Sequence, residues 1–377
     1  MKNKKLILLI IGLAVALIIV FASAHKGDKS AKVKIGLLTP LSGNLASVGE
    51  IQKAAVEMAL NHLKSTGVDT SKYEIIYEDS KFDPKASLTG YEALKLRGAR
   101  IIMADGSPVV AAIRPKAVED KNLLFIQGAT TPLFTDNSPY TCRLGLTADT
   151  FGPLIADRAT NLGYSKAAII TPNNEYGKGM SDAISSSFKG KIVTKEIYDQ
   201  ATGDLRSNIT KLLAAQKNID VLFVINNTTP EPMFKQLHEL GWNKPIVSDV
   251  WSITSPNMKD RSVANGTTFI DYNYSLQPEL NTNDEAAAFA RQYAEKYKLP
   301  PILLAALTYD SFNMIANAIE KTGSSNPGEL TSELTKTVGY AGIAGDVTLD
   351  SSCNNTNTKF VWRKVTQQGK FESAPTK

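Results

Sequence analysis

Small and polar residues follow most of the short apolar runs of this chain, where strands would end and helices begin. Free backbone N–H groups and the positive end of a helix meet at such points, and they favour an anionic ligand group, typically a carboxylate. A loop with an N-cap explains each stretch taken alone, but their recurrence predicts a small-molecule site at the strand ends. The stretches are Leu41-Ser42-Gly43, Asp105-Gly106-Ser107-Pro108, Gly128-Ala129-Thr130-Thr131-Pro132, Asn174-Glu175-Tyr176-Gly177-Lys178-Gly179, Asn226-Asn227-Thr228-Thr229-Pro230 and Ser248-Asp249-Val250-Trp251.

Signals for catalysis are weak. His62 and His238 fall in expected helices without cysteine or carboxylate at metal-binding spacing, and no nucleophile elbow, Walker loop or dinucleotide fingerprint occurs. The carboxylates Glu78, Asp79 and Asp83 could suggest metal or acid–base chemistry, but Asp83 capping a helix that starts at Pro84 also explains its place. We therefore expect a non-catalytic protein without metal or cofactor, with an exported hydrolase as the enzymatic alternative.

The first 24 residues have the layout of a secretory signal. Lysines precede an apolar run from Leu6 to Phe21, and Ala22-Ser23-Ala24 supplies a small-residue cleavage site. The run also approaches the length of a short membrane span. We expect export to the periplasm or the extracellular face, either with cleavage after Ala24 or with anchoring through residues 6–21.

Composition limits the partners and the architecture. Three of the 42 basic side chains are lysines of the signal segment, so the remaining basic side chains nearly balance the 37 acidic ones. Such a balance gives no net positive charge that would favour binding to nucleic acid. The remaining chain, roughly 350 residues, is long enough for two lobes. Cys142 and Cys353 could form one long-range disulfide, which export permits, or remain unpaired.

Short apolar runs alternate with amphipathic stretches, a rhythm typical of parallel α/β sheets. The first expected series contains strands Val33–Leu38, Tyr73–Glu78, Ile101–Ala104 and Leu123–Gln127. A second series contains strands Ala167–Thr171, Lys191–Tyr198, Val221–Ile225, Pro245–Val247 and Thr267–Tyr272. Long helices are expected at Asp284–Tyr297 and Leu303–Lys321, and Asp346–Leu349 with Phe360–Val365 are expected to form a closing antiparallel hairpin.

From Lys32 onward the chain resembles the type I periplasmic binding proteins, specifically the leucine/isoleucine/valine-binding branch that serves ABC importers. No single motif is decisive, but their order and spacing are specific. The motifs are Lys34-Ile35-Gly36-Leu37-Leu38-Thr39-Pro40-Leu41-Ser42-Gly43, Glu78-Asp79-Ser80 with Asp83-Pro84, Gly128-Ala129-Thr130-Thr131-Pro132, Glu175-Tyr176-Gly177-Lys178-Gly179, and Tyr309-Asp310.

The resemblance implies two α/β lobes with parallel sheets flanked by helices, joined by three crossovers. Lobe 1 would comprise residues 32–146 plus 273–345, and lobe 2 residues 147–272 plus 346–377. The crossovers would lie near Leu144–Thr147, Ile270–Asn273 and Gly345–Asp346. The implied function is a monomeric solute-binding protein that closes over a small ligand and delivers it to an ABC permease in the membrane. A ligand-sensing ectodomain of the same fold is the alternative.

The same resemblance implies roles for individual residues. Ser107 would bind a ligand carboxylate, Thr130 would contact both carboxylate and ammonium, and the carbonyl of Gly128, next to Ala129, would meet the ammonium. Tyr176 would cover the ligand from the second lobe and exclude water.

The chain also departs from the pattern of amino-acid-binding members. Thr228 stands where they usually have a tyrosine, and Val48 stands where an aromatic residue is common. Val250 takes the place of an acidic residue, so Asp249 would balance an ammonium only if it points into the cleft, and a one-residue slip would turn it away. Related members bind amides, urea or organic acids, and Trp251 could line such a pocket or pack as an interlobe or core aromatic.

Overall fold

The first sheet consists of five parallel strands in the order β2-β1-β3-β4-β5. The computed structural model describes residues 32–130, 138–200 and 202–374. The strands of this sheet are β1 (Val33–Thr39), β2 (Tyr73–Asp79), β3 (Ile101–Ala104), β4 (Leu123–Ile126) and β5 (Thr141–Arg143). The first four correspond to the strands expected from the sequence.

Helices cover both faces of this sheet, which explains its nearly continuous apolar strands. Ile35 and Leu37 of β1 pack towards α2 (Ala46–Ser65) and α11 (Leu303–Thr322), whereas Leu38 packs towards the opposite face. That opposite face is covered by α3 (Pro84–Leu96) and α4 (Ser107–Glu119). Asp83 caps α3 by accepting a hydrogen bond from the N–H of Ala86 at 2.8 Å, which confirms the capping interpretation.

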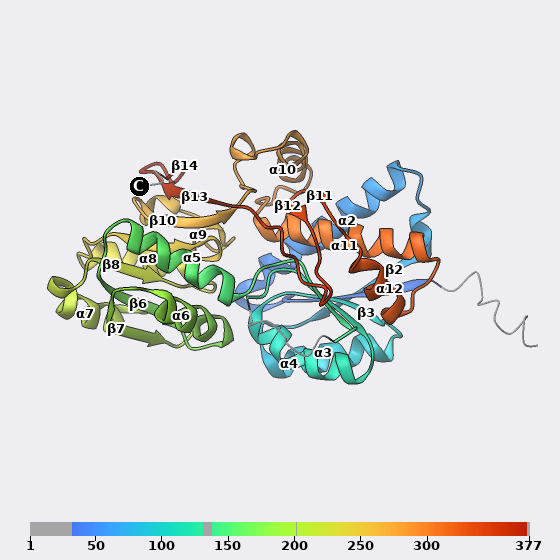
Figure 1. The fold of residues 1–377 in the computed structure, drawn as a ribbon, viewed down its shortest axis with the longest axis horizontal. Coiled ribbons are helices and arrows are strands. Elements are labelled where there is room, and N and C mark those ends of the chain that lie inside the picture. Colours follow the sequence, from blue (N-terminus) through green and yellow to red (C-terminus); the bar gives the residue numbers. More distant parts are fainter. Residues whose placement is uncertain (1–31, 131–137, 201, 375–377) are drawn as a thin grey trace, which may run out of the picture.

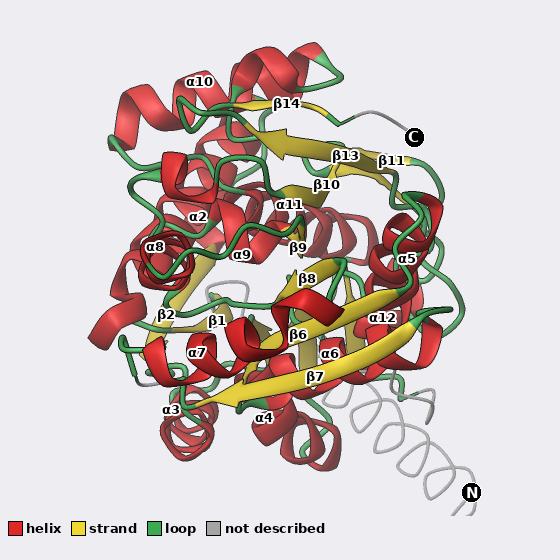
Figure 2. Cartoon of the chain, turned by 90° about the vertical axis from the view of Figure 1, so that its left-hand side faces the viewer, coloured by secondary structure: helices red, strands yellow, loops and turns green. Residues whose placement is uncertain are grey.

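The second sheet has seven strands in the order β14-β13-β10-β9-β8-β6-β7 and lies beside the first along the long axis of the molecule (Figure 1). Its parallel part comprises β6 (Lys166–Pro172), β7 (Lys191–Tyr198), β8 (Val221–Val224), β9 (Ile246–Asp249) and β10 (Thr268–Tyr272). Figure 2 views this sheet from the side of β7, with α6 and α7 nearby. The side chains of α5 (Ala148–Asn161) and α6 (Glu175–Ser187) share one core cluster, and those of α7 (Arg206–Ala215) and α8 (Pro230–Glu239) share another.

The prediction that Asp346–Leu349 and Phe360–Val365 pair with each other as a closing hairpin is wrong. β12 (Gly345–Val347) pairs with β11 (Tyr340–Gly342), whereas β13 (Phe360–Val365) pairs antiparallel with β10 and with β14 (Phe371–Ser373). Alternating strands fit any antiparallel partner, so the open edge of β10 in the second sheet decided the pairing of β13. The other helices are α9 (Val250–Thr254), α10 (Asp284–Tyr297) and α12 (Pro327–Leu334), with 3₁₀ turns at Gly43–Leu45, Thr70–Lys72, Gln216–Asn218, Arg261–Ala264 and Pro278–Leu280.

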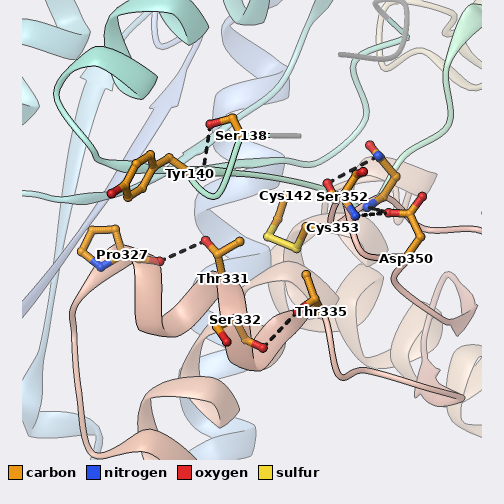
Figure 3. Close-up of a disulfide and its surroundings, with 11 residues drawn as sticks. Ser138, Tyr140, Cys142, Pro327, Thr331, Ser332, Thr335, Asp350, Ser352 and Cys353 are labelled. Atoms are coloured by element: carbon orange, nitrogen blue, oxygen red, sulfur yellow. Dashed lines mark hydrogen bonds between the residues drawn. A yellow bond between two sulfur atoms is a disulfide. The ribbon is translucent and has the colours of Figure 1, made fainter. Parts of the chain in front are cut away.

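A segment near the C-terminus is bound to the edge of the first sheet. The N–H of Arg143 donates to the carbonyl of Cys353 at 2.8 Å, and the N–H of Asn355 donates to the carbonyl of Arg143 at 3.0 Å. Cys142 and Cys353 form a disulfide beside α12 (Figure 3). The chain therefore leaves the first sheet after Asn355, later than the expected crossover at Gly345–Asp346.

The N-terminal segment and the question of membrane-spanning helices are considered together. The signal or anchor segment, residues 1–24, lies outside the described residues. Within the described ranges, none of the helices combines the length and the apolar character needed to cross a membrane.

We expect the disulfide to contribute about 2–4 kcal/mol to the free energy of unfolding, because it joins residues 211 positions apart and restricts the unfolded chain. Urea denaturation with and without dithiothreitol measures this contribution. A variant carrying both Cys142→Ser and Cys353→Ser should unfold at the lower urea concentration and no longer respond to the reductant. Two titratable thiols in the untreated, denatured protein would contradict the pairing.

Candidate ligand-binding site

A cavity lies between the lobes and is bordered by strand ends of both sheets. Its volume, measured as the space open to the centre of a water molecule, is about 70 Å³. One water requires roughly 10–15 Å³ by the same measure, so the cavity suits a small molecule. The apolar part of its lining consists of Pro40, Leu45, Val48, Phe82, Ile302 and Leu304.

Two hydroxyl groups meet at the polar end of the cavity. Ser107 is the first residue of α4, and its Oγ lies 3.4 Å from Oγ1 of Thr130, which follows β4. Both side chains are 2% exposed. Gly106 precedes Ser107 with φ of 88°, and a Cβ there would overlap the ring of Phe82. The structure thus brings together two of the residues expected to bind a carboxylate, at a helix N-terminus that favours negative charge.

The loop that carries Gly128, Ala129 and Thr130 is held from behind. Nη1 of Arg143 donates to the carbonyl of Ala129 at 3.0 Å, and the N–H of Ala148 donates to the carbonyl of Thr130 at 2.8 Å. Burial, together with the charge of Arg114, lowers the pKa of Arg143 to about 10. All three loop residues line the cavity, whereas Thr131 and Pro132 of the same motif lie outside the described residues.

Trp251 of α9 crosses from the second lobe to the first. A Cβ on Gly128 would lie 3.0 Å from Cη2 of Trp251 and 2.8 Å from Oδ1 of Asp105. Only glycine at this position leaves room for the indole and the carboxylate together. Trp251 lines the cavity and also packs between the lobes, so the two roles considered for it coincide.

Tyr176 and Asp249 form a buried pair in the second lobe. The hydroxyl of Tyr176, on the first turn of α6, donates to Oδ2 of Asp249. Oδ1 of Asp249 accepts from the N–H of Ser252 at 3.0 Å and thereby caps α9. Tyr176 lines the cavity, but Asp249 is fully buried behind it and does not. Burial raises the pKa of Asp249 to about 6, although the hydrogen bond from Tyr176 opposes the shift.

Thr228 faces a neighbouring recess rather than the main cavity. That recess is lined by Asn44, Leu45, Lys81, Phe82, Gln200, Thr228 and Thr229. Oδ1 of Asn226 accepts from the N–H groups of Thr228 and Thr229, at 3.0 and 2.9 Å, and this turn orients the loop. Asn227 therefore lines the main cavity in place of Thr228.

Sequence reasoning placed two cavity residues, Asp105 and Asn227, in strand-end stretches without giving them a role, and it missed others. Asp105 directly follows a buried strand, so its position carried a signal, as did that of Asn227. Phe82 lies in a turn after β2 with no apolar pattern around it, and Ile302 and Leu304 come from the start of α11, far along the chain. Nothing local to these last three residues indicated a cavity.

Asp79 at the end of β2 organises two loops beside the cavity. Its carboxylate accepts from the N–H of Leu41 at 2.8 Å, the hydroxyl of Ser42 at 2.6 Å and the N–H of Lys81 at 2.9 Å. Lys81 and Phe82 both have positive φ, 49° and 55°, a conformation that costs free energy in residues with a Cβ. Although burial opposes it, these hydrogen bonds hold the pKa of Asp79 below its usual value.

The lobes also meet at the mouth of the cavity. Nδ2 of Asn257, after α9, donates to the carbonyl of Asn44 in the first lobe at 3.1 Å and to that of Thr228 in its own lobe at 3.2 Å. Helices α4 and α6 pack against each other across the same boundary. The structure is therefore a closed arrangement, with residues of both lobes around one cavity.

We expect Asp79→Asn to lower the free energy of unfolding at pH 7 by about 1–3 kcal/mol, because charge-assisted hydrogen bonds to three donors are weakened. The pKa of Asp79 is lower in the folded than in the unfolded chain, so its contribution is complete above the unfolded value of about 3.9 and is lost as the pH falls through the folded value. Urea denaturation at pH 7 and pH 3 should therefore show a difference between variant and parent that shrinks at pH 3. Glu78→Gln on the same strand, which loses only a half-exposed ion pair with Arg97, is the control. An equal loss in both variants would refute the role of Asp79.

Comparison with known proteins agrees with this architecture. Residues 32–370 match the model of the periplasmic binding protein family. The Leu/Ile/Val-binding protein homolog 3 of Brucella melitensis is 25% identical over 335 residues, which cover 84% of this chain and 86% of that protein.

Solved structures share the fold. A branched-chain amino acid transporter substrate-binding protein from Streptococcus pneumoniae, in complex with isoleucine, has a TM-score of 0.78 at 24% identity, covering 91% of this chain and 98% of that one. An ABC transporter solute-binding protein from R. palustris, in complex with benzoate, has a TM-score of 0.79 at 19% identity, covering 91% and 95%. The family match extends over both lobes, and the chain belongs to the periplasmic binding proteins, a class of solute-binding proteins.

Proposed function

We propose that this protein is the exported solute-binding component of an ABC importer, and that it binds an amino acid of the branched-chain type, or a similar small carboxylate or amide, between its lobes. The observation that carries this proposal is the meeting of the Ser107 and Thr130 hydroxyls at the N-terminus of α4, inside a cavity covered by Tyr176 and Trp251. The names of the relatives support the same class of ligand.

The shape of the cavity suits a ligand with one polar and one apolar end. The polar end offers two hydroxyls and a helix N-terminus to a carboxylate, without a basic side chain among the described lining residues. The apolar lining residues, among them Leu45, Val48 and Ile302, suit an aliphatic or aromatic group. Burial of that group would add affinity in proportion to its apolar area.

The mechanism would be a shift of population from open to closed forms. Ser107 and Thr130 belong to the first lobe, whereas Tyr176 and Trp251 belong to the second, so a ligand contacts all four only when the lobes are closed. Only contacts that are better in the closed form drive closure. The closed form would then be recognised by a permease.

We further propose that the protein acts outside the cytoplasm as a single chain. The N-terminal signal supports export, with residues 6–21 either removed or kept as an anchor. One chain supplies the cavity from both of its lobes, which agrees with action as a monomer. The roles of Gly128 and Ala129 in this proposal are to present backbone groups to the ligand beside Thr130.

The proposal is tested by a thermal-shift screen of residues 25–377 against amino acids, short amides, urea and small organic acids. A ligand that binds only the folded state stabilises it by about 2.7 kcal/mol at a hundredfold excess over its Kd. A shift with aliphatic amino acids supports the proposal, and a shift only with acids or amides retains solute binding but changes the ligand. Absence of any shift would contradict it.

We expect Ser107→Ala and Thr130→Ala each to weaken ligand binding by about 1–3 kcal/mol, because each removes a buried hydrogen-bonding hydroxyl from the polar end of the cavity. Isothermal titration with the ligand from the screen measures the change. Thr89→Ala on the exposed side of α3 removes a hydroxyl away from the cavity and should leave the affinity unchanged. Parent-like affinity in both cavity variants would disprove the proposed site.

A further inference from the structure

The cavity contains a charge that the proposed site does not yet explain. Among the described lining residues, Asp105 is the one acidic side chain, and no lysine, arginine or histidine is present to balance it. A ligand carboxylate bound at Ser107 and Thr130 would lie near Asp105, because Asp105 is two residues before Ser107 and beside Gly128. Two carboxylates without a compensating cation would repel each other in a site shielded from water.

One oxygen of the Asp105 carboxylate lacks a hydrogen bond of good geometry, although the N–H groups of Gly106 and Gly128 lie close to the carboxylate. Its Oδ1 is buried and has no hydrogen-bond partner among the described residues. The residue lines the cavity, and its Oδ1 lies 2.8 Å from the position that a Cβ on Gly128 would take. A buried oxygen of this kind costs free energy unless a donor satisfies it.

Asp249, the acidic residue behind Tyr176, already accepts hydrogen bonds on both of its carboxylate oxygens. Oδ2 of Asp249 accepts from the hydroxyl of Tyr176, and its Oδ1 accepts from the N–H of Ser252 at 3.0 Å and the hydroxyl of Ser252 at 3.3 Å. Asp249 is fully buried behind Tyr176 and does not line the cavity. A ligand could reach it only by displacing the tyrosine.

We propose that Asp105 of the first lobe, and not Asp249 of the second, is the counter-charge for an amino group on the ligand. The inference rests on the proposed function and makes it more specific. The site selects molecules that carry an ammonium next to the carboxylate over acids of the same shape that lack it. The ammonium satisfies Oδ1 of Asp105 and separates the two carboxylates.

The surroundings of Asp105 agree with this role. Burial raises the pKa of Asp105 to about 6, while the N–H groups of Gly106 and Gly128 oppose the shift. The side chain therefore remains mostly ionised at neutral pH. Nearby, Oδ1 of Asn227 and Nε1 of Trp251 also line the cavity without a partner among the described residues, so a further acceptor and a donor are available to the polar end of a ligand.

The test compares matched ligands that differ only in the amino group. The probes are L-leucine, L-valine and L-alanine, each paired with its amine-free acid, 4-methylpentanoate, 3-methylbutanoate and propanoate. Isothermal titration measures the Kd of each for residues 25–377 of the parent, Asp105→Asn and Asp249→Asn. Asparagine retains the shape of the side chain but removes its charge, and melting without ligand establishes that each variant is folded.

We expect the parent to prefer at least one amino acid over its amine-free partner. Asp105→Asn should weaken binding of that amino acid about tenfold to a hundredfold, the range for a lost charge-assisted hydrogen bond, while binding of the amine-free acid stays the same or improves. A purely structural defect would weaken both members of the pair alike. Asp249→Asn, acting through Tyr176, should change both members by a similar factor.

The outcomes separate the inference from the proposed function. Binding of amino acids that is unchanged in Asp105→Asn, or an amine-specific loss in Asp249→Asn, would overturn the inference and leave solute binding intact. Binding of the amine-free acids alone would also overturn it. If the parent binds none of the six probes, the assignment to aliphatic amino acids fails and the inference fails with it.

Discussion

The close approach of Trp251 to Gly128 is the contact on which the closed site depends. Gly128 has no side chain, and a Cβ there would be 3.0 Å from the indole and 2.8 Å from the carboxylate of Asp105. The indole reaches the first-lobe loop and lines the cavity together with Ser107 and Thr130. A side chain at position 128 would require the indole or the Asp105 carboxylate to shift.

The two aspartates near the cavity, Asp105 in the first lobe and Asp249 in the second, differ in how their carboxylates are hydrogen-bonded. Asp249 stabilises its own lobe, since it caps α9 and holds Tyr176 in place. Asp105 lines the cavity, and its buried Oδ1 forms no hydrogen bond of good geometry with the described residues. A carboxylate that already accepts hydrogen bonds on both oxygens gains little from a ligand, whereas one with an unsatisfied buried oxygen gains a great deal. The two aspartates therefore differ in their surroundings, although Asp105 directly follows β3 and Asp249 is the last residue of β9.

The strands next to the connections between the lobes are held by contacts between residues that are far apart in the sequence. The disulfide and the main-chain hydrogen bonds of Arg143 hold residues 353–355 to β5, and the side chain of Arg143 supports the carbonyl of Ala129 in the cavity. On the second sheet, Nε of Arg363 on β13 donates to Oδ2 of Asp271 on β10 at 2.8 Å, and both residues are buried. The disulfide, the ion pair and the main-chain hydrogen bonds thus hold the strands next to the connecting segments.

Local patterns in the sequence predicted the alternating strands and helices and a site at the strand ends, because apolar periodicity and turn residues act locally. The strands β1 to β4, the helices α10 and α11, and the place of Ser107 and Thr130 at strand ends were indicated in this way. The role of the two hydroxyls at a ligand carboxylate came from the resemblance to the family. Contacts between distant segments set the pairing of β13 with β10, the position of Asp249 behind Tyr176, and the presence of Phe82 and Ile302 at the cavity. These outcomes depend on partners distant in sequence, such as Tyr176 and Asp249, which are 73 residues apart. The burial and hydrogen bonding of a side chain are set by such partners, and no local pattern records them.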